Sequence, residues 1–172
     1  MDLIQALTSR RSIRSFDTTK HITDNQIHSL LEIARWAPSA GNLQSYQFIV
    51  VKNSKQKMLL AKTLMGRDKV STASAVFICC ADTKLSSEEY GPRGKSLYAI
   101  QDATLAAYAL WLAVHNINLG GVWIGSFYEK KVQKLLSIPP YLKPVVILPI
   151  GYPAEKPKIT SRKTIEEIVR FD

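Results

Sequence analysis

Residues 74–81 read SAVFICCA, a nearly unbroken apolar run with the length of a β-strand. Successive side chains of a strand point to opposite faces, so this run is apolar on both. Strands of that kind lie in the middle of a sheet that is covered on both sides. The run therefore predicts a central strand, and helices must cover the sheet around it.

The segments on either side of this run predict two more strands, at Gln47–Val51 and Val145–Ile150. Helices are predicted where apolar residues recur at helical spacing. The first is capped by Asp2, and the second follows a capping box at Thr23–Gln26 and is stopped by Pro38. The predicted helices span residues 3–9, 24–37, 55–65, 98–118 and 129–136.

This alternation of helices and strands indicates the α/β or α+β class and one domain over residues 1–172. Residues 82–96 are polar and interrupted by Gly and Pro, which predicts a loop or a mobile flap. Residues 122–124 predict a short strand or a turn. The helix at 98–118 is apolar nearly all round, so in a domain this small a second subunit is expected to cover part of it.

The chain has a net charge of +9, with 46% hydrophobic and 22% charged residues, which are globular values. Its lysines are dispersed and accompany no nucleic-acid motif, so no nucleic-acid partner is expected. The two cysteines, Cys79 and Cys80, are adjacent in a predicted strand and are expected to be buried free thiols in a reducing cytoplasm. No signal peptide is predicted, the scattered histidines predict no metal site, and the apolar stretch at 103–114 is shorter than the ~20 residues of a membrane span.

A cluster of cations follows the first predicted helix. It consists of Arg10, Arg11, Ser12 and Arg14. A phosphate monoester carries about −1.5 to −2 charges at neutral pH, and guanidinium groups bind it bidentately. The cluster is therefore a candidate phosphate site. Taken alone, it also fits a solvated basic patch at the carboxyl end of a helix.

Two further segments carry polar or glycine-rich patterns. Residues 38–44 read PSAGNLQ, and the amides of Asn42 and Gln44 match the alternating donors and acceptors along the edge of a flat heterocycle. Residues 120–126 read GGVWIGS, which lacks the spacing of a dinucleotide fingerprint. Backbone N–H groups at Gly125 and Ser126 are candidate donors to a ring nitrogen, whereas Trp123 is expected to pack in the core. Each segment alone also fits an ordinary connection.

Taken together and in order, these segments resemble the nitroreductase family of flavin-dependent oxidoreductases. The matching elements are Arg-x-Ser-x-Arg at 10–14, Pro-Ser-x-x-Asn-x-Gln at 38–44, a helix that opens near Asp102, Gly-x-x-Trp-Ile-Gly at 120–125 and Pro-Ile-Gly-Tyr-Pro at 149–153. The chain departs from the family pattern at Ser45-Tyr46, where relatives have Pro-Trp. The resemblance implies an α+β fold in three layers, with a small, mostly antiparallel sheet flanked by helices.

The resemblance also implies bound FMN, NAD(P)H as the hydride donor and an interlocked homodimer with the flavin at the subunit interface. By position in the motifs, it assigns the FMN phosphate and ribityl chain to Arg10, Arg11, Ser12 and Arg162. It places Arg14 near the N1–O2 side of the flavin ring and Lys69 where some relatives have a ring-contacting lysine.

The remaining assignments concern the flavin ring. The resemblance implies that the loop of Pro38, Ser39, Asn42 and Gln44 approaches the ring from the other subunit. Ile124 and Gly125 are expected beside flavin N5, with a backbone N–H as donor. No catalytic side chain is expected, because flavin N5 carries the chemistry.

The function implied is transfer of a hydride from NAD(P)H through the flavin to a nitroaromatic, quinone or related small-molecule acceptor, in two half-reactions. Specialised chemistry in the same fold, such as dehalogenation or flavin fragmentation, is an alternative. A basic binding protein without redox chemistry is another, and steeply salt-dependent retention of nucleic acid without flavin would distinguish it.

Overall fold

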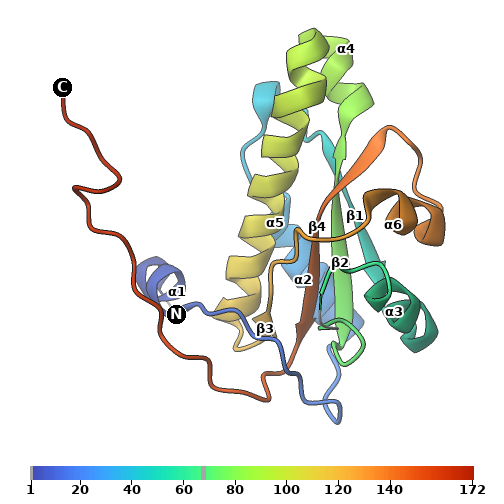
Figure 1. Ribbon diagram of the computed structural model, residues 1–172, viewed down its shortest axis with the longest axis vertical. Coiled ribbons are helices and arrows are strands. Elements are labelled where there is room, and N and C mark those ends of the chain that lie inside the picture. Colours follow the sequence, from blue (N-terminus) through green and yellow to red (C-terminus); the bar gives the residue numbers. More distant parts are fainter. Residues whose placement is uncertain (1, 67–68) are drawn as a thin grey trace.

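One antiparallel sheet organises the chain in the computed structural model, which describes residues 2–66 and 69–172 (Figure 1). Within that part of the chain the strand order is β1-β2-β4-β3. The side chains of β2 from Ala75 to Ala81 are almost completely inaccessible, because β2 lies between two strands and under helices on both faces. The predicted central strand is therefore confirmed. The strands are β1 Tyr46–Val51, β2 Ala75–Asp82, β3 Gly120–Gly121 and β4 Leu142–Gly151.

A β-bulge interrupts the pairing of the two inner strands. Cys79 pairs with Val146, whereas Cys80 pairs with Pro144, so β4 holds one extra residue at this point. Proline has no N–H to give to the ladder, and a bulge is where a sheet tolerates it. The two cysteines are free and face opposite helical layers, as the sequence predicted. Burial raises the pKa of Cys80 to about 12.

Helices cover both faces of the sheet and make three layers. α2 and α5 pack on one face with the core around Phe77 and Leu148, while α3 and α6 pack on the other with Ile78 and Ile147. This arrangement confirms the α+β fold with a small antiparallel sheet between helices. The helices are α1 Leu3–Ser9, α2 Asp24–Ala34, η1 Ala40–Asn42, α3 Ser54–Ala61, α4 Thr83–Arg93, η2 Gly94–Tyr98, α5 Ala99–Asn116 and α6 Glu129–Leu136.

Local capping signals were read correctly from the sequence. The Asp2 carboxylate accepts a hydrogen bond from the N–H of Gln5, and Thr23 and Gln26 form a reciprocal capping box. Residues 122–124, predicted as a short strand or a turn, hold a single bridge in which Ile124 pairs with Ile147. The ladder of β3 lies two residues earlier, at Gly120–Gly121.

The prediction of a loop or mobile flap over residues 82–96 is wrong, because this segment is helical. The Asp82 carboxylate caps α4 by accepting from the N–H of Leu85, and Thr83 donates to the carbonyl of Tyr141. Gly91, at φ +57° and ψ −144°, makes one sharp break, and Pro92 then opens the next turn. The Gly-Pro pair therefore marks a kink between two helical segments and not a loop.

Residues Thr83–Asn116 consequently form a near-continuous helical segment of 34 residues. By length and composition alone, this segment could cross a membrane. It is longer than the sequence indicated because residues 83–98 join the apolar helix. Its alanines, including Ala99, Ala103 and Ala107, pack against the sheet in the core. This packing is that of the core helix of a globular fold.

We predict that Gly91→Ala lowers the free energy of unfolding by about 1–3 kcal/mol, because only glycine adopts this backbone conformation without strain. A Cβ at position 91 meets no atom within 4 Å, so the cost comes from the backbone alone. Gly66→Ala is the matched control, since its Cβ is equally free of contacts and its φ is not positive. Urea titration at one fixed protein concentration measures both variants. Equal stability of the two would contradict the role given to Gly91.

Candidate functional site

The arginine segment lies along the edge of the sheet beside β3. Arg10 ends α1, and the N–H of Ile13 donates to the carbonyl of Gly121 at 3.0 Å. A Cβ on Gly120 would come within 2.7 Å of the Ile13 side chain, so glycine at 120 allows this close approach. The chain from Arg10 to Arg14 is thus irregular but fixed, and several of its side chains reach one site.

The C-terminal segment passes beside these arginines and completes a cavity. The N–H of Ala154 donates to the carbonyl of Ser15, and the Glu155 carboxylate accepts from the N–H groups of Arg14 and Ser15. These bonds hold the segment against the edge of the sheet. The resulting cavity, of about 440 Å³, is called the arginine pocket here and is lined by Arg10, Arg11, Ser12, Arg14, Glu155, Lys156, Pro157, Lys158, Thr160 and Arg162.

The arginine pocket is strongly positive, since six of its side chains are cationic and one is a carboxylate. The guanidinium of Arg10 lies over the ring of Trp111, 3.8 Å from its centre. Burial lowers the pKa of Arg10, Tyr108 raises it, and the charges of Arg162 and Arg11 lower it again. The cations therefore repel one another, and a bound anion would stabilise their charged forms.

Two donors in this pocket lack acceptors. The Nε atoms of Arg10 and Arg11 are buried and have no hydrogen-bond partner among the described residues. Arg11 does use its Nη1, which donates to the carbonyls of Thr8 and Arg10 at the end of α1. Leaving a buried donor unsatisfied costs about 1–3 kcal/mol, so such groups are normally paired in a complete site. The residues present thus fit a bound phosphate.

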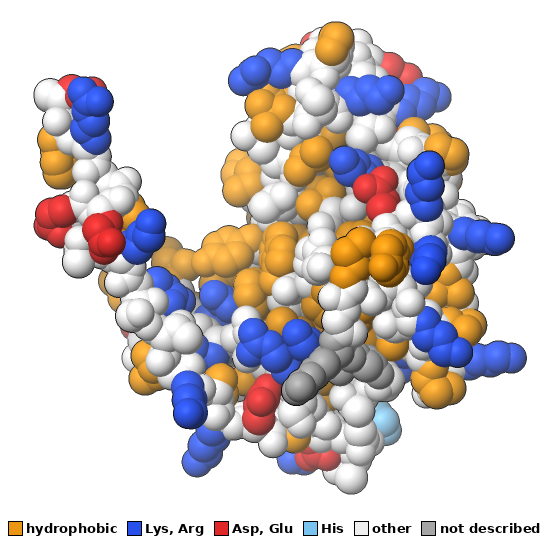
Figure 2. Space-filling model, in the orientation of Figure 1, with side chains coloured by type: hydrophobic (Ala, Val, Ile, Leu, Met, Phe, Trp, Pro, Cys, Tyr) orange, Lys and Arg blue, Asp and Glu red, His pale blue; other side chains and the backbone are white. Residues whose placement is uncertain are grey.

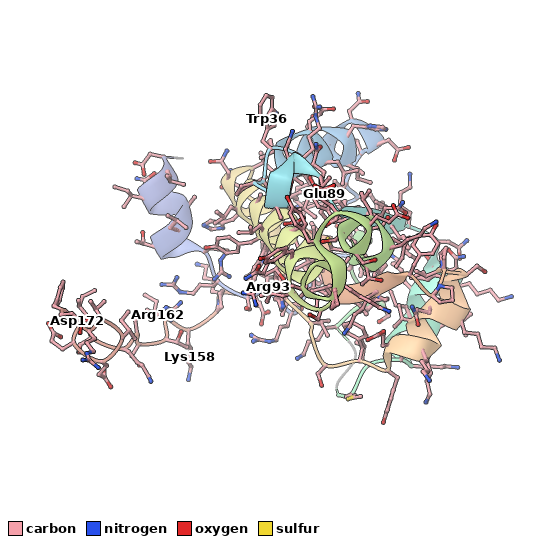
Figure 3. The ribbon with its side chains drawn as sticks, turned by 90° about the horizontal axis from the view of Figure 1, so that it is seen from above. Trp36, Glu89, Arg93, Lys158, Arg162 and Asp172 are labelled. Atoms are coloured by element: carbon pink, nitrogen blue, oxygen red, sulfur yellow. The ribbon has the colours of Figure 1, made fainter. Side chains whose placement is uncertain are left out.

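Arg162 reaches the pocket from the extended tail that follows β4. Its Nη1 donates to Thr160 and to the carbonyl of Ser161, which holds the guanidinium close to its own backbone. Figure 3 shows Lys158, Arg162 and Asp172 in succession along this tail as it leaves the body of the protein. The structure therefore places all four predicted residues of the arginine segment together with Arg162.

The first part of the polar loop at 38–44 lines a different cavity, of about 550 Å³, beside the start of α5, whereas Asn42 and Gln44 are not among its lining residues. Pro38 and Ser39 line it, together with Tyr98, Gln101 and Leu105. In the loop itself, the Ser39 hydroxyl accepts from the N–H of Gln44. This cavity and the arginine pocket share no lining residue and lie toward opposite ends of α5 (Figure 1). One copy of the chain therefore keeps the two predicted halves of the site apart.

The loop has an unusual backbone. Gly41, Asn42 and Gln44 have φ values of +55°, +58° and +52°, in the left-handed region. For Asn42 and Gln44 this conformation carries a strain that neighbouring contacts must offset. The Gln44 side-chain amide donates to the carbonyl of Asn42, and both side chains are exposed.

The segment at 123–125 lies between these two regions. Ile124 exchanges hydrogen bonds of 3.0 Å with Ile147, so its own N–H is occupied. Gly125 lines a third cavity with Ile100 and Lys143. Trp123 packs on Trp111 with ring centres 5.9 Å apart, in line with the expected core role. Lys69 lies half-buried in the connection between α3 and β2.

Sequence reasoning missed several residues at these cavities. Glu155, Lys156 and Lys158 were not predicted as site residues, because nothing in their spacing indicates that this segment turns back along the arginines. Tyr98 and Gln101 were missed although they lie in the predicted helix at 98–118, because nothing in the helical pattern indicates which of its residues line a cavity. A carboxylate followed by alternating Lys and Pro was the one available signal, and it is a weak one.

The sequence matches the profile of the nitroreductase family over residues 7–78 and 60–152. It is 32% identical over 161 residues to a Methanothermobacter thermautotrophicus protein provisionally named NADH dehydrogenase/NAD(P)H nitroreductase, covering 91% of this chain and 80% of the relative. It is 28% identical over 181 residues to a Bacillus subtilis FMN reductase (NADPH), covering 95% of this chain and 72% of that protein.

A solved structure shares the fold. It is that of a provisionally named nitroreductase from Exiguobacterium sibiricum, determined in complex with FMN. Its TM-score is 0.89 at 22% identity, and the match covers 100% of this chain and 98% of that one. The family profile spans most of the chain, and the three-layer architecture agrees with it. The protein therefore belongs to the nitroreductase family.

Proposed function

We propose that this protein is an FMN-dependent oxidoreductase that takes a hydride from NAD(P)H and delivers it to a small-molecule acceptor, with nitroaromatics and quinones as the first acceptors to test. The observation that supports this most directly is the arginine pocket with its two unpaired, buried Nε donors. Those donors suit a phosphate monoester, the one dianionic group of FMN. The FMN reductase and nitroreductase names of the relatives agree with this assignment.

In this proposal the chain's own residues bind and orient the cofactor. Arg10, Arg11, Ser12 and Arg162 hold the phosphate and the ribityl chain through charge-assisted hydrogen bonds. Arg14 directs positive charge to the N1–O2 side of the ring, with Lys69 as a second cation. The N–H of Ile124 is already used by Ile147, so we assign the donor to flavin N5 to the amide of Gly125.

FMN supplies the redox chemistry, accepting a hydride at N5 and passing it on. The protein contributes position and charge, and it needs no nucleophile or general base for this reaction. Residues 1–172 act as one FMN-binding domain. Two buried thiols in the reduced state suit the cytoplasm, where we place the protein.

A homodimer completes the site. Three regions of one copy leave apolar side chains exposed: Ile4 on α1 (73% exposed), Trp36 after α2 (80%) and Phe171 at the end of the tail (86%). Figure 2 shows the tail apart from the body, with hydrophobic side chains lining the hollow between them. Such large, highly exposed apolar side chains suit burial in an interface, and a second copy of this chain is the occupant that the family favours.

The dimer also explains why the two halves of the site are separate. The loop of Pro38, Ser39, Asn42 and Gln44 lies too far along α5 to share a cavity with Arg10 in the same copy. In a two-fold arrangement, the loop of one subunit faces the flavin whose phosphate is held by its partner. Each flavin thus lies at the interface and contacts both chains.

We predict that Arg162→Ala weakens FMN binding by about 10- to 100-fold, because a charge-assisted hydrogen bond to phosphate contributes about 1.5–3 kcal/mol. Riboflavin has the same ring and ribityl chain and no phosphate, so its affinity should change much less. Fluorescence titration of the apoprotein with both ligands measures this difference. Arg170→Ala is the matched control, since Arg170 lies on the same tail and pairs with Asp172. An equal loss for both ligands would show that Arg162 does not contact the phosphate.

We predict that Arg14→Ala slows flavin reduction by NAD(P)H by about 10- to 100-fold and lowers the flavin potential, because a positive charge beside N1 stabilises the charge that develops there. Stopped-flow absorbance on the FMN-loaded variant gives the rate, and dye-coupled reduction gives the potential. Unchanged values for both in a fully loaded variant would remove Arg14 from this role.

We predict that Phe171→Ser raises the dissociation constant of the dimer by at least about 10-fold, because it removes a large apolar side chain from the interface. Met58→Ser is the control, since Met58 is an exposed apolar residue on α3, on the side of the body opposite the tail (54% exposed). Sedimentation velocity over a dilution series compares the two variants. A monomeric parent protein, or equal effects of the two changes, would count against the proposed interface.

A further inference from the structure

We propose that Asp102 is a positioning residue that holds the loop Pro38–Gln44 in the conformation in which it contacts the flavin. This inference rests on the proposed function, because it assigns a role to a residue behind the flavin-facing loop. Asp102 lies on the first turn of α5, at the wall of the cavity that Pro38 and Ser39 also line, and only 2% of its surface is accessible.

Both carboxylate oxygens of Asp102 bind this one loop. Oδ1 accepts from the N–H of Ala40 at 3.0 Å, and Oδ2 accepts from the hydroxyl of Ser45 at 2.6 Å. Ser45 is completely buried. The two bonds are made at either end of the segment Gly41–Gln44, so one side chain of α5 fixes both ends of the part that carries the candidate flavin contacts.

In the described part of the chain, hydrogen bonds, and no ion pair, hold the side chain of Asp102. No Lys or Arg among residues 2–66 and 69–172 forms an ion pair with Asp102. A buried carboxylate without a cation is costly, and an apolar residue of similar size often stabilises a core better. The short bond from Ser45 is typical of a charge-assisted hydrogen bond, which is about twice as strong as a neutral one.

The backbone of the loop explains why such a strong anchor is needed. Gly41, Asn42 and Gln44 all have positive φ, and two of these are not glycine. A loop with this strain relaxes to other conformations unless its surroundings hold it. Asp102 holds it from α5, and lies 62 residues from Ala40 and 57 residues from Ser45 in the sequence.

A second contact comes from α4 on the outer side. A Cβ at Gly41 would lie 2.2 Å from the hydroxyl oxygen of Tyr90, so that hydroxyl rests against the Cα of Gly41. In Figure 3, η1 lies between Trp36 and the part of α4 that carries Glu89. The loop is therefore held between two helices. Asp102 of α5 accepts hydrogen bonds from Ala40 and Ser45, and Tyr90 of α4 packs against Gly41.

The test compares FMN with riboflavin on the dimeric protein. Asp102→Ala should weaken both ligands by the same factor, about 10-fold or more, because two hydrogen bonds are lost and the loop contacts the ring that both ligands share. Asp102→Asn should recover most of the affinity, since its amide still accepts from Ala40 and can donate to Ser45. Asp24→Asn, an exposed carboxylate on α2, is the control and should bind both ligands like the parent.

The outcomes separate this inference from the proposed function. A parent protein that takes up no FMN would overturn the proposed function. A parent that binds FMN, together with a folded Asp102→Ala dimer of unchanged affinity, would overturn only the role of Asp102, and so would a loss confined to FMN. If Asp102→Ala fails to fold, Ser45→Ala removes one bond alone and should weaken both ligands by about 3- to 10-fold. No effect from Ser45→Ala would contradict the proposal.

A mixed dimer tests whether the anchored loop serves the partner's flavin. One chain carries Asp102→Ala and the other Arg162→Ala, each with a different affinity tag. If the loop acts across the interface, one of the two sites combines the intact loop with the intact pocket, and half of the sites should bind FMN with the parent affinity. A mixed dimer without any site of parent affinity would show that the loop acts on the flavin of its own chain.

Discussion

The contact between α5 and the central strand β2 is the constraint on which the rest of the structure depends. α5 turns small side chains, Ala99, Ala103 and Ala107, toward the sheet, and the thiol of Cys79 donates to the carbonyl of Ala103. Small residues let a helix lie close to a strand. A close-packed interior has low compressibility, so a shift of one element moves the elements packed against it. The position of α5 therefore sets the position of everything attached to it.

Both halves of the candidate site are attached to this helix. Near its start, Asp102 holds the polar loop through Ala40 and Ser45, and near its end Trp111 supports the guanidinium of Arg10. The helix thus separates the two halves in one copy while keeping each in a fixed place. In the proposed homodimer, the same separation lets two chains contribute to each flavin.

Within the described part of one chain, two arginines of the site have unpaired donors, and the buried carboxylate of the site has no cation beside it. Arg10 and Arg11 each have a buried Nε without an acceptor, and Asp102 is buried without a cation. An unpaired buried donor costs stability, so stability does not account for the two arginines. A phosphate anion would satisfy the first two, and a strained loop that must be held in place accounts for the third.

Much of the fold could be predicted from the sequence alone, because it depends on local and periodic patterns. Apolar runs identified β2 and β4, capping residues identified the starts of α1 and α2, and ordered motifs identified the family. The wrong prediction at residues 82–96 arose because Gly91 and Pro92 are compatible with either a loop or a kinked helix. The contact between Thr83 and Tyr141, which helps to fix the helix, is a tertiary one that the local sequence does not show.

The sequence by itself determined the strands β1, β2 and β4, most of the helices, the family and the kind of residue that can hold a phosphate. The tertiary structure decided how these residues combine. Glu155 binds the backbone of Arg14 from 141 positions away, and Asp102 binds Ser45 from 57 positions away, so no local pattern marks either contact. Such pairs meet because the packing of α5 on β2 and the return of the tail along the edge of the sheet bring distant parts of the chain together.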